Sequence, residues 1–121
     1  MRHELSFDPQ TRIMTIVVKG AYNLEETIKT ETYMKSRTTD LDSYFLLADL
    51  REASASLDKE VRKRLQNQMS EENLERVAMV VTNPAVRMIG KVVIATMGKS
   101  GNTRFFKTTE EGLAWLKDDT K

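Results

Sequence analysis

The sequence predicts one α/β domain spanning residues 1–121, with the element order β-β-α-β-α-β-α-β-α. A chain of 121 residues is close to the commonest domain size and leaves no room for a second independent core. Stretches with strand patterns alternate with stretches of helical period along the chain. This alternation predicts a mostly parallel five-stranded sheet with helices on both faces, to which an N-terminal hairpin adds an antiparallel strand.

The first two strands are expected at residues 4–8 and 12–19, where apolar side chains recur at period two. Residues 8–11 join them, with Asp8 and Pro9 at the first two positions of a type I turn. His3 has the strand parity of Leu5 and Phe7, so we expect a half-buried packing residue. The pair should therefore form an antiparallel hairpin.

Capping residues and apolar spacing define the remaining elements. Asn23 and Glu26 form a capping box for a helix over 24–37, on which Glu31 is expected to pair with Lys35. Residues 44–50 form an almost continuous apolar run, which predicts a central strand. A helix with the apolar stripe Leu57, Val61, Leu65 and Met69 follows, and then a strand at 77–81. Asn83 and Pro84 open a helix at 84–97, which leads to a strand at 103–107. Thr108 and Glu111 cap a last helix, whose inner face carries Leu113 and Leu116.

Composition argues against several classes of function. The 19 basic and 18 acidic residues leave a net charge of +1, so we expect no nucleic-acid partner. The chain has no cysteine and one histidine, so we expect no metal site, no cofactor and no catalytic residues. No run of about 18 apolar residues occurs, so no transmembrane segment is expected and a cytoplasmic location is predicted.

Three segments carry a resemblance to a known family. They are the strand end 46–50 (LLADL), the strand-to-helix passage formed by 77–81 (VAMVV) and 83–87 (NPAVR), and the closing stretches 104–108 (RFFKT) and 110–116 (EEGLAWL). Together they resemble the bacterial STAS-like proteins, the group of stage II sporulation protein AA and other anti-sigma-factor antagonists, which is related to CRAL-TRIO lipid-binding domains. The resemblance implies this fold and a binding or regulatory role.

The sequence departs from that family at its phosphorylated serine. The antagonists carry this serine in an Asp-Ser-Ser-Gly-like turn after the third strand, whereas residues 52–59 here read EASASLDK. Ser54 and Ser56 are the phosphosite candidates in this stretch, although the family motif is missing.

A binding rim is expected beyond the carboxyl ends of the parallel strands, where helix N-termini also point. This rim would hold Asp49, Arg51, Asn83 and Arg87, with Arg87 a candidate ligand for a phosphate or carboxylate and Asn83 orienting its loop. In the alternative interpretation, Asn83 is only a helix cap, Arg87 is a solvated charge, and Asp49 caps the following turn or pairs with Arg51.

The helix at 84–97 carries apolar side chains over more than half of its circumference, which is more than one sheet face covers. Burial under a neighbouring helix and Trp115 is one explanation. Contact with a partner is the other. The residues expected at such an interface are Met88, Lys91, Val92, Ile94 and Ala95.

These observations favour a non-catalytic binding domain that contacts a protein partner, or a second copy of itself as a homodimer, through this helix and the rim. The alternative is a small-molecule or lipid-binding protein with a pocket under the same helix. An enzyme is the third interpretation, and no acid, base or nucleophile pair supports it.

Overall fold

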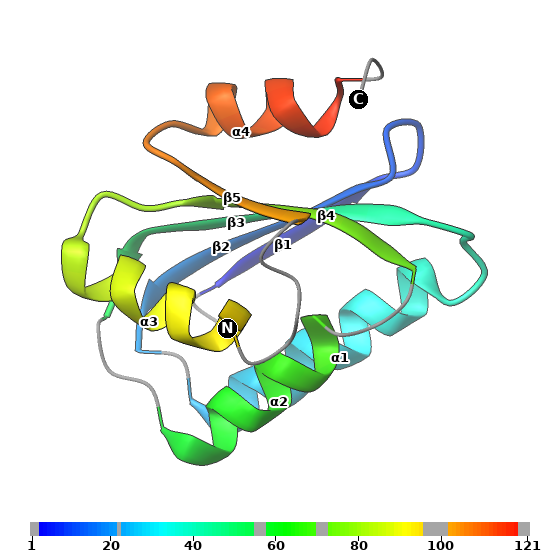
Figure 1. Ribbon diagram of the computed structural model, residues 1–121. Helices are drawn as coiled ribbons and strands as arrows, with labels where there is room; N and C mark the ends of the chain where they lie inside the picture. Colours follow the sequence, from blue (N-terminus) through cyan, green and yellow to red (C-terminus); the bar gives the residue numbers. More distant parts are fainter. Residues whose placement is uncertain (1–2, 22, 55–57, 70–72, 96–101, 119–121) are drawn as a thin grey trace.

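The computed structural model describes residues 3–21, 23–54, 58–69, 73–95 and 102–118. It has the predicted order of elements (Figure 1). The strands are β1 (Glu4–Asp8), β2 (Ile13–Gly20), β3 (Tyr44–Ala53), β4 (Leu74–Val80) and β5 (Thr103–Phe106). The helices are α1 (Leu24–Thr38), α2 (Lys59–Met69), α3 (Pro84–Ala95) and α4 (Thr109–Leu116).

The five strands form one sheet whose spatial order follows the sequence, β1-β2-β3-β4-β5. β1 pairs antiparallel with β2, and every later pairing is parallel. Right-handed crossovers that always step in the same direction place their helices on the same face of a sheet. Accordingly α1, α2 and α3 cover one face, and α4, which follows the last strand, covers the other (Figure 1). The expectation of helices on both faces is confirmed.

The two faces of the sheet bury two separate cores, because successive side chains of a strand point to opposite sides. The larger core lies under α1–α3, and the smaller one lies under α4. The larger core contains Met14, Ile16, Val18, Met34, Tyr44, Leu46, Ala48, Val61, Leu74, Val77 and Met79. The smaller contains Ile13, Phe45, Leu47, Ala78, Val80 and Leu116, with Phe106, Leu113 and Trp115 packed against it.

Local signals define the hairpin and the predicted caps of α1 and α4. The Asp8 carboxylate accepts a hydrogen bond from the Gln10 backbone N–H at 2.9 Å, as an Asx-turn requires. Arg12, predicted to open the second strand, is instead left-handed with φ 61° and completes the loop, so that β2 begins at Ile13. Asn23 Oδ1 accepts from Glu26 N at 2.8 Å, and Thr108 Oγ1 accepts from Glu111 N at 3.2 Å.

Strand ends differ from the prediction where polar residues continue the pairing. β3 runs past Leu50 to Ala53, because Glu52 and Ala53 pair with the end of β2. β4 begins at Leu74, before the apolar run at 77–81, and its early residues include Glu75 and Arg76. Of the stripe predicted for α2, Leu57 lies outside the described residues.

Candidate interaction surfaces

Asp49 and Arg51 form a closed ion pair near the carboxyl end of β3. Arg51 donates from Nε to Asp49 Oδ1 at 2.9 Å and from Nη2 to Oδ2 at 2.7 Å. The two sit at an irregularity in the β2–β3 register, between the pairs Val17–Asp49 and Lys19–Glu52, where β3 contains one extra residue. The Arg51 hydrogen bonds hold the pKa of the Asp49 carboxyl below its usual range, although burial acts in the opposite direction. The pair therefore remains charged at neutral pH.

Asn83 and Arg87 lie at the start of α3. Asn83 Oδ1 accepts from the Ala85 backbone N–H at 2.9 Å, which makes Asn83 a helix cap. The Arg87 guanidinium lies over the Phe105 ring, 5.4 Å from its centroid, and Arg87 is exposed. No ion pair with Arg87 is present among the described residues. Stacking fixes the guanidinium plane and leaves its N–H groups available to solvent or to a partner.

The structure brings the four rim residues together as two pairs on opposite faces of the sheet. Arg87 stacks on Phe105, which packs against the core under α1–α3. Asp49 has the strand parity of Leu47, whose side chain lies in the core under α4. The negative charge of Glu110, in the first turn of α4, also contributes to raising the pKa of Arg51. One ligand smaller than the thickness of the sheet would not reach both pairs.

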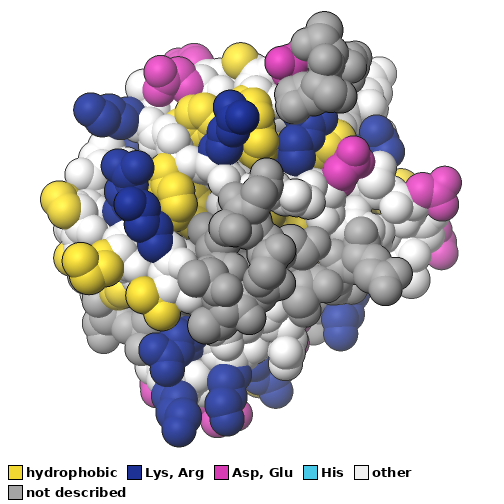
Figure 2. Space-filling model, in the orientation of Figure 1, with side chains coloured by type: hydrophobic (Ala, Val, Ile, Leu, Met, Phe, Trp, Pro, Cys, Tyr) yellow, Lys and Arg dark blue, Asp and Glu magenta, His cyan; other side chains and the backbone are white. Residues whose placement is uncertain are grey.

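Part of the apolar surface predicted on α3 is exposed. Met88 keeps 67% and Val92 49% of its surface accessible, and Lys91 between them is exposed. The opposite side of the helix packs closely on the sheet, where Val86 is buried and Gly90 lies against Phe105 and Met79. Hydrophobic side chains gather over α3 at the left of Figure 2. The side chains of Ile94 and Ala95 lie outside the described residues.

Trp115 does not cover α3, contrary to one of the explanations weighed for this helix. It belongs to α4, on the other face of the sheet, where its ring centroid lies 5.8 Å from that of Phe106. Within the described part of the chain, α2 is the helix that packs beside α3, and this contact leaves Met88 and Val92 accessible.

The remaining candidates lie apart from α3. Ser54 is exposed directly after β3, and its backbone N–H donates to Gly20 O at 2.9 Å, whereas Ser56 lies outside the described residues. No group of three potential metal ligands occurs in the described ranges. None of the helices, over the same ranges, is long and apolar enough to cross a membrane.

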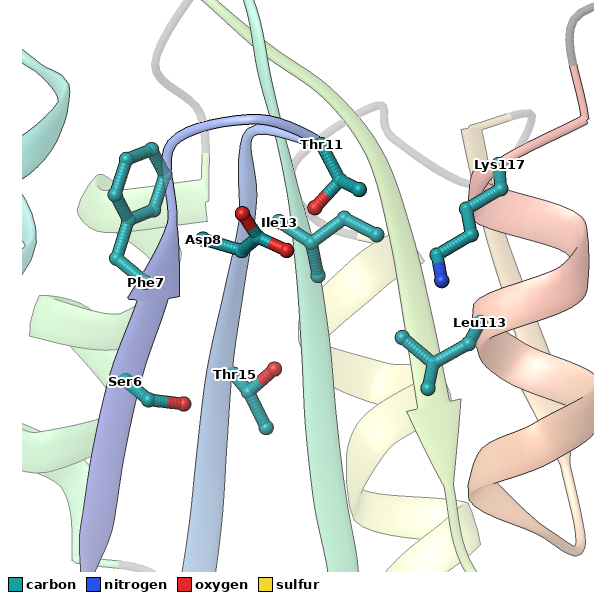
Figure 3. Close-up of a pocket in the computed structure, with 8 residues that line it drawn as sticks. All are labelled: Ser6, Phe7, Asp8, Thr11, Ile13, Thr15, Leu113 and Lys117. Atoms are coloured by element: carbon teal, nitrogen blue, oxygen red, sulfur yellow. The ribbon is translucent and has the colours of Figure 1, made fainter.

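An open cavity of about 260 Å³ lies between the β1–β2 hairpin and α4 (Figure 3). Thr11 from the hairpin loop and Lys117 from the end of α4 extend toward it, and Ile13 from β2 and Leu113 from α4 line its two sides. α4 packs on β3, β4 and β5, so this hollow marks the edge of the sheet face that the helix covers.

Solved structures identify the class of fold. The chain is similar to an uncharacterised protein of the DUF3478 family with a SpoIIAA-like fold from Shewanella loihica PV-4, with a TM-score of 0.72 and 15% identity over 94% of this chain and 91% of that one. It is also similar to an anti-sigma factor antagonist from Mycobacterium paratuberculosis, with a TM-score of 0.63 and 17% identity over 96% of this chain and 95% of that one. The protein therefore has a STAS-like fold, as its sequence motifs predicted.

The family model described as "Domain of unknown function (DUF7793)" matches residues 10–119, and the chain belongs to this family. No curated protein shows significant similarity to it. The relation to CRAL-TRIO lipid-binding domains stays a prediction.

Proposed function

We propose that the protein is a non-catalytic regulatory domain that acts by binding another protein chain through the exposed side of α3. The observation that carries the proposal is the pair Met88 and Val92, one helical turn apart and 67% and 49% exposed. Large apolar side chains at this spacing form a continuous strip along a helix. Lys91 beside the strip and Arg87 at the helix start would provide charged contacts around it.

The fold supports the same proposal. One structure with this fold is an anti-sigma factor antagonist, and that name refers to a protein target, the anti-sigma factor. Asn83 and Arg87 extend the α3 surface toward the carboxyl ends of the strands, and Arg87 offers its N–H groups to an acidic side chain of the partner. Asp49 and Arg51 lie at the same end of the sheet but on the α4 side, where a large partner would reach them around the edge.

The test compares α3 with a second exposed apolar pair. Leu24 and Ile28 on α1 are also one turn apart, with 37% and 42% of their surfaces exposed, and provide the matched control. A photoreactive amino acid would replace Met88 in one variant and Ile28 in the other, each expressed in the host. We expect defined protein adducts from position 88, identified by mass spectrometry, and none of comparable yield from position 28. Equal adducts from both positions, or none from either, would contradict the proposal.

Native mass spectrometry of the purified chain separates the kinds of occupant. If α3 joins two copies, the wild type is a dimer, Met88→Asp is a monomer, and Ile28→Asp remains a dimer, because a buried unpaired charge disrupts only the interface that contains it. A monomer that carries a discrete additional mass would instead support the small-molecule or lipid-binding alternative.

A further inference from the structure

A row of arginines and aromatic rings crosses the amino-terminal end of the parallel strands on the α4 side. The Arg12 guanidinium lies 5.5 Å from the Phe45 ring centroid, and Arg76 lies 4.9 Å from the same ring. Arg76 also lies 5.6 Å from the Trp115 ring centroid, and Arg104 lies 5.2 Å from the same centroid. We call these five residues the arginine row. In Figure 2, basic and hydrophobic side chains are interleaved where β5 and α4 meet.

The central arginine has a structural role. Arg76 Nη1 donates to the carbonyl oxygens of Trp115 at 2.9 Å and Asp118 at 3.3 Å, at the carboxyl end of α4. A cation at this position satisfies free carbonyl groups and interacts favourably with the negative end of the helix dipole. Arg76 therefore fixes the end of α4 on the sheet, and this role explains one of the three arginines.

The outer two arginines have spare donors. A guanidinium carries five N–H groups. Arg12 uses Nη1 for Ser43, at 3.2 Å to its carbonyl oxygen and 2.6 Å to its hydroxyl, and Arg104 has no side-chain hydrogen bond within the described ranges. Over these ranges neither forms an ion pair with a carboxylate. Both guanidinium groups are thus held by stacking on rings while their N–H edges remain available.

Three like charges placed along one edge repel each other, and within the described ranges no carboxylate forms an ion pair with any of the three. Such a row presents planar donor forks, which match carboxylates in bidentate geometry. We propose that the arginine row binds an acidic segment of a partner protein, with Arg12 and Arg104 as the direct contacts. This surface lies on the opposite face of the sheet from α3, so it goes beyond the α3 interface and stands without it.

Two other anionic partners fit this surface less well. A single-stranded nucleic acid would use the aromatic faces for stacking its bases, but the guanidinium groups already lie over the rings of Phe45 and Trp115. An anionic membrane surface is normally bound by cations together with exposed large apolar side chains. The large apolar side chains exposed in the described residues are Leu24, Ile28, Met88 and Val92, and all belong to α1 or α3.

The experiment measures fluorescence anisotropy of a fluorescein-labelled hexaglutamate peptide titrated with the full chain. Arg104→Gln is the test variant, since the Arg104 side chain is exposed and replacing it breaks no hydrogen bond of the described structure. Arg37→Gln is the matched control, because Arg37 on α1 also stacks on a ring, 4.6 Å from the centroid of Tyr33. Both variants lose one positive charge, so a purely global charge effect is equal in the two.

We expect Arg104→Gln to weaken peptide binding about fivefold, the effect of losing one well-oriented guanidinium contact, with Arg37→Gln within about twofold of the wild type. Equal loss in the two variants, or no binding by the wild type, would overturn the proposal. A labelled hexathymidylate that binds more tightly than the peptide and is equally weakened by Arg104→Gln would also overturn it, in favour of nucleic acid.

Discussion

The close packing of α4 on the sheet depends on Gly112, and replacing it with alanine tests this directly. A Cβ at position 112 would lie 2.8 Å from Leu47 Cδ1 and 3.4 Å from the Ala78 Cβ. Unstrained carbon contacts begin at about 3.5 Å, so the added methyl group is roughly 0.7 Å too close to Leu47. Leu47 is 2% exposed and belongs to the core under α4, so it has little room to retreat.

Two effects of opposite sign decide the outcome of Gly112→Ala. Alanine favours the helix by about 1 kcal/mol over glycine. Overpacking a filled core costs about 1–3 kcal/mol. We expect a net loss of about 1 kcal/mol in the free energy of unfolding, measured by urea denaturation, and a decrease in Tm of about 4 °C for a domain of this size. An increase in stability would refute the close-contact argument.

Two further variants isolate the contact. Leu47→Val removes the obstructing methyl group, so in that background Gly112→Ala should stabilise the protein by about 0.5–1 kcal/mol, since only the propensity gain remains. Gly90 on α3 is a milder case, because its nearest contact would be Phe105 at 3.2 Å. Gly90→Ala should therefore change stability less than Gly112→Ala does. If the sign does not reverse in the Leu47→Val background, some other contact of Gly112 is responsible.

Two other predictions concern polar pairs in which at least one partner is buried. Asp49→Asn should lower the free energy of unfolding by about 1–2 kcal/mol at pH 7, a value reduced to allow for the exposure of Arg51. Because folding lowers the Asp49 pKa, the difference in Tm between wild type and variant should shrink as the pH falls below about 4, and a pH-independent difference would contradict this. His3→Ala should lower the free energy of unfolding, measured by urea denaturation, by about 2 kcal/mol, because Nδ1 of the buried ring accepts a hydrogen bond from the Lys19 backbone N–H at 2.9 Å and Nε2 lies 3.1 Å from Glu26 Oε2. In a Glu26→Gln background the same substitution should cost less, and an equal loss would show that His3 and Glu26 are not coupled.

Much of the fold follows from signals within a few residues of sequence. The period-two pattern of β2, the apolar run of β3 and the caps Asn23 and Thr108 predict their elements because strand alternation and helix capping are local effects. The boundaries of β3 and β4 were wrong by up to three residues. There the pairing continues through polar residues such as Glu52 and Arg76, which a search for apolar runs passes over.

Contacts between distant segments could not be predicted in the same way. The sequence suggested a pair between Glu31 and Lys35, one helical turn apart, but Glu31 instead accepts from Arg64 of α2 at 2.9 Å. His3 was expected to be half buried and is 4% exposed, and its Nε2 lies 3.1 Å from Glu26 Oε2 at the start of α1. The arginine row was missed for a similar reason, since Arg12, Arg76 and Arg104 come together only when β2, β4 and β5 are aligned and α4 has docked.

The strand order affects where the proposed binding surfaces lie in this protein. In open α/β sheets, a crevice for ligands forms where the strand order reverses and neighbouring helices diverge to opposite faces. Here the order runs from β1 to β5 without reversal, and α1, α2 and α3 share one face, so the parallel strands form no such crevice. The rim residues accordingly lie as separate pairs on two faces, Asp49 with Arg51 and Asn83 with Arg87. This geometry therefore favours the proposed binding through exposed surfaces that a whole protein chain can cover, and the strip on α3 and the arginine row are the two surfaces that we propose.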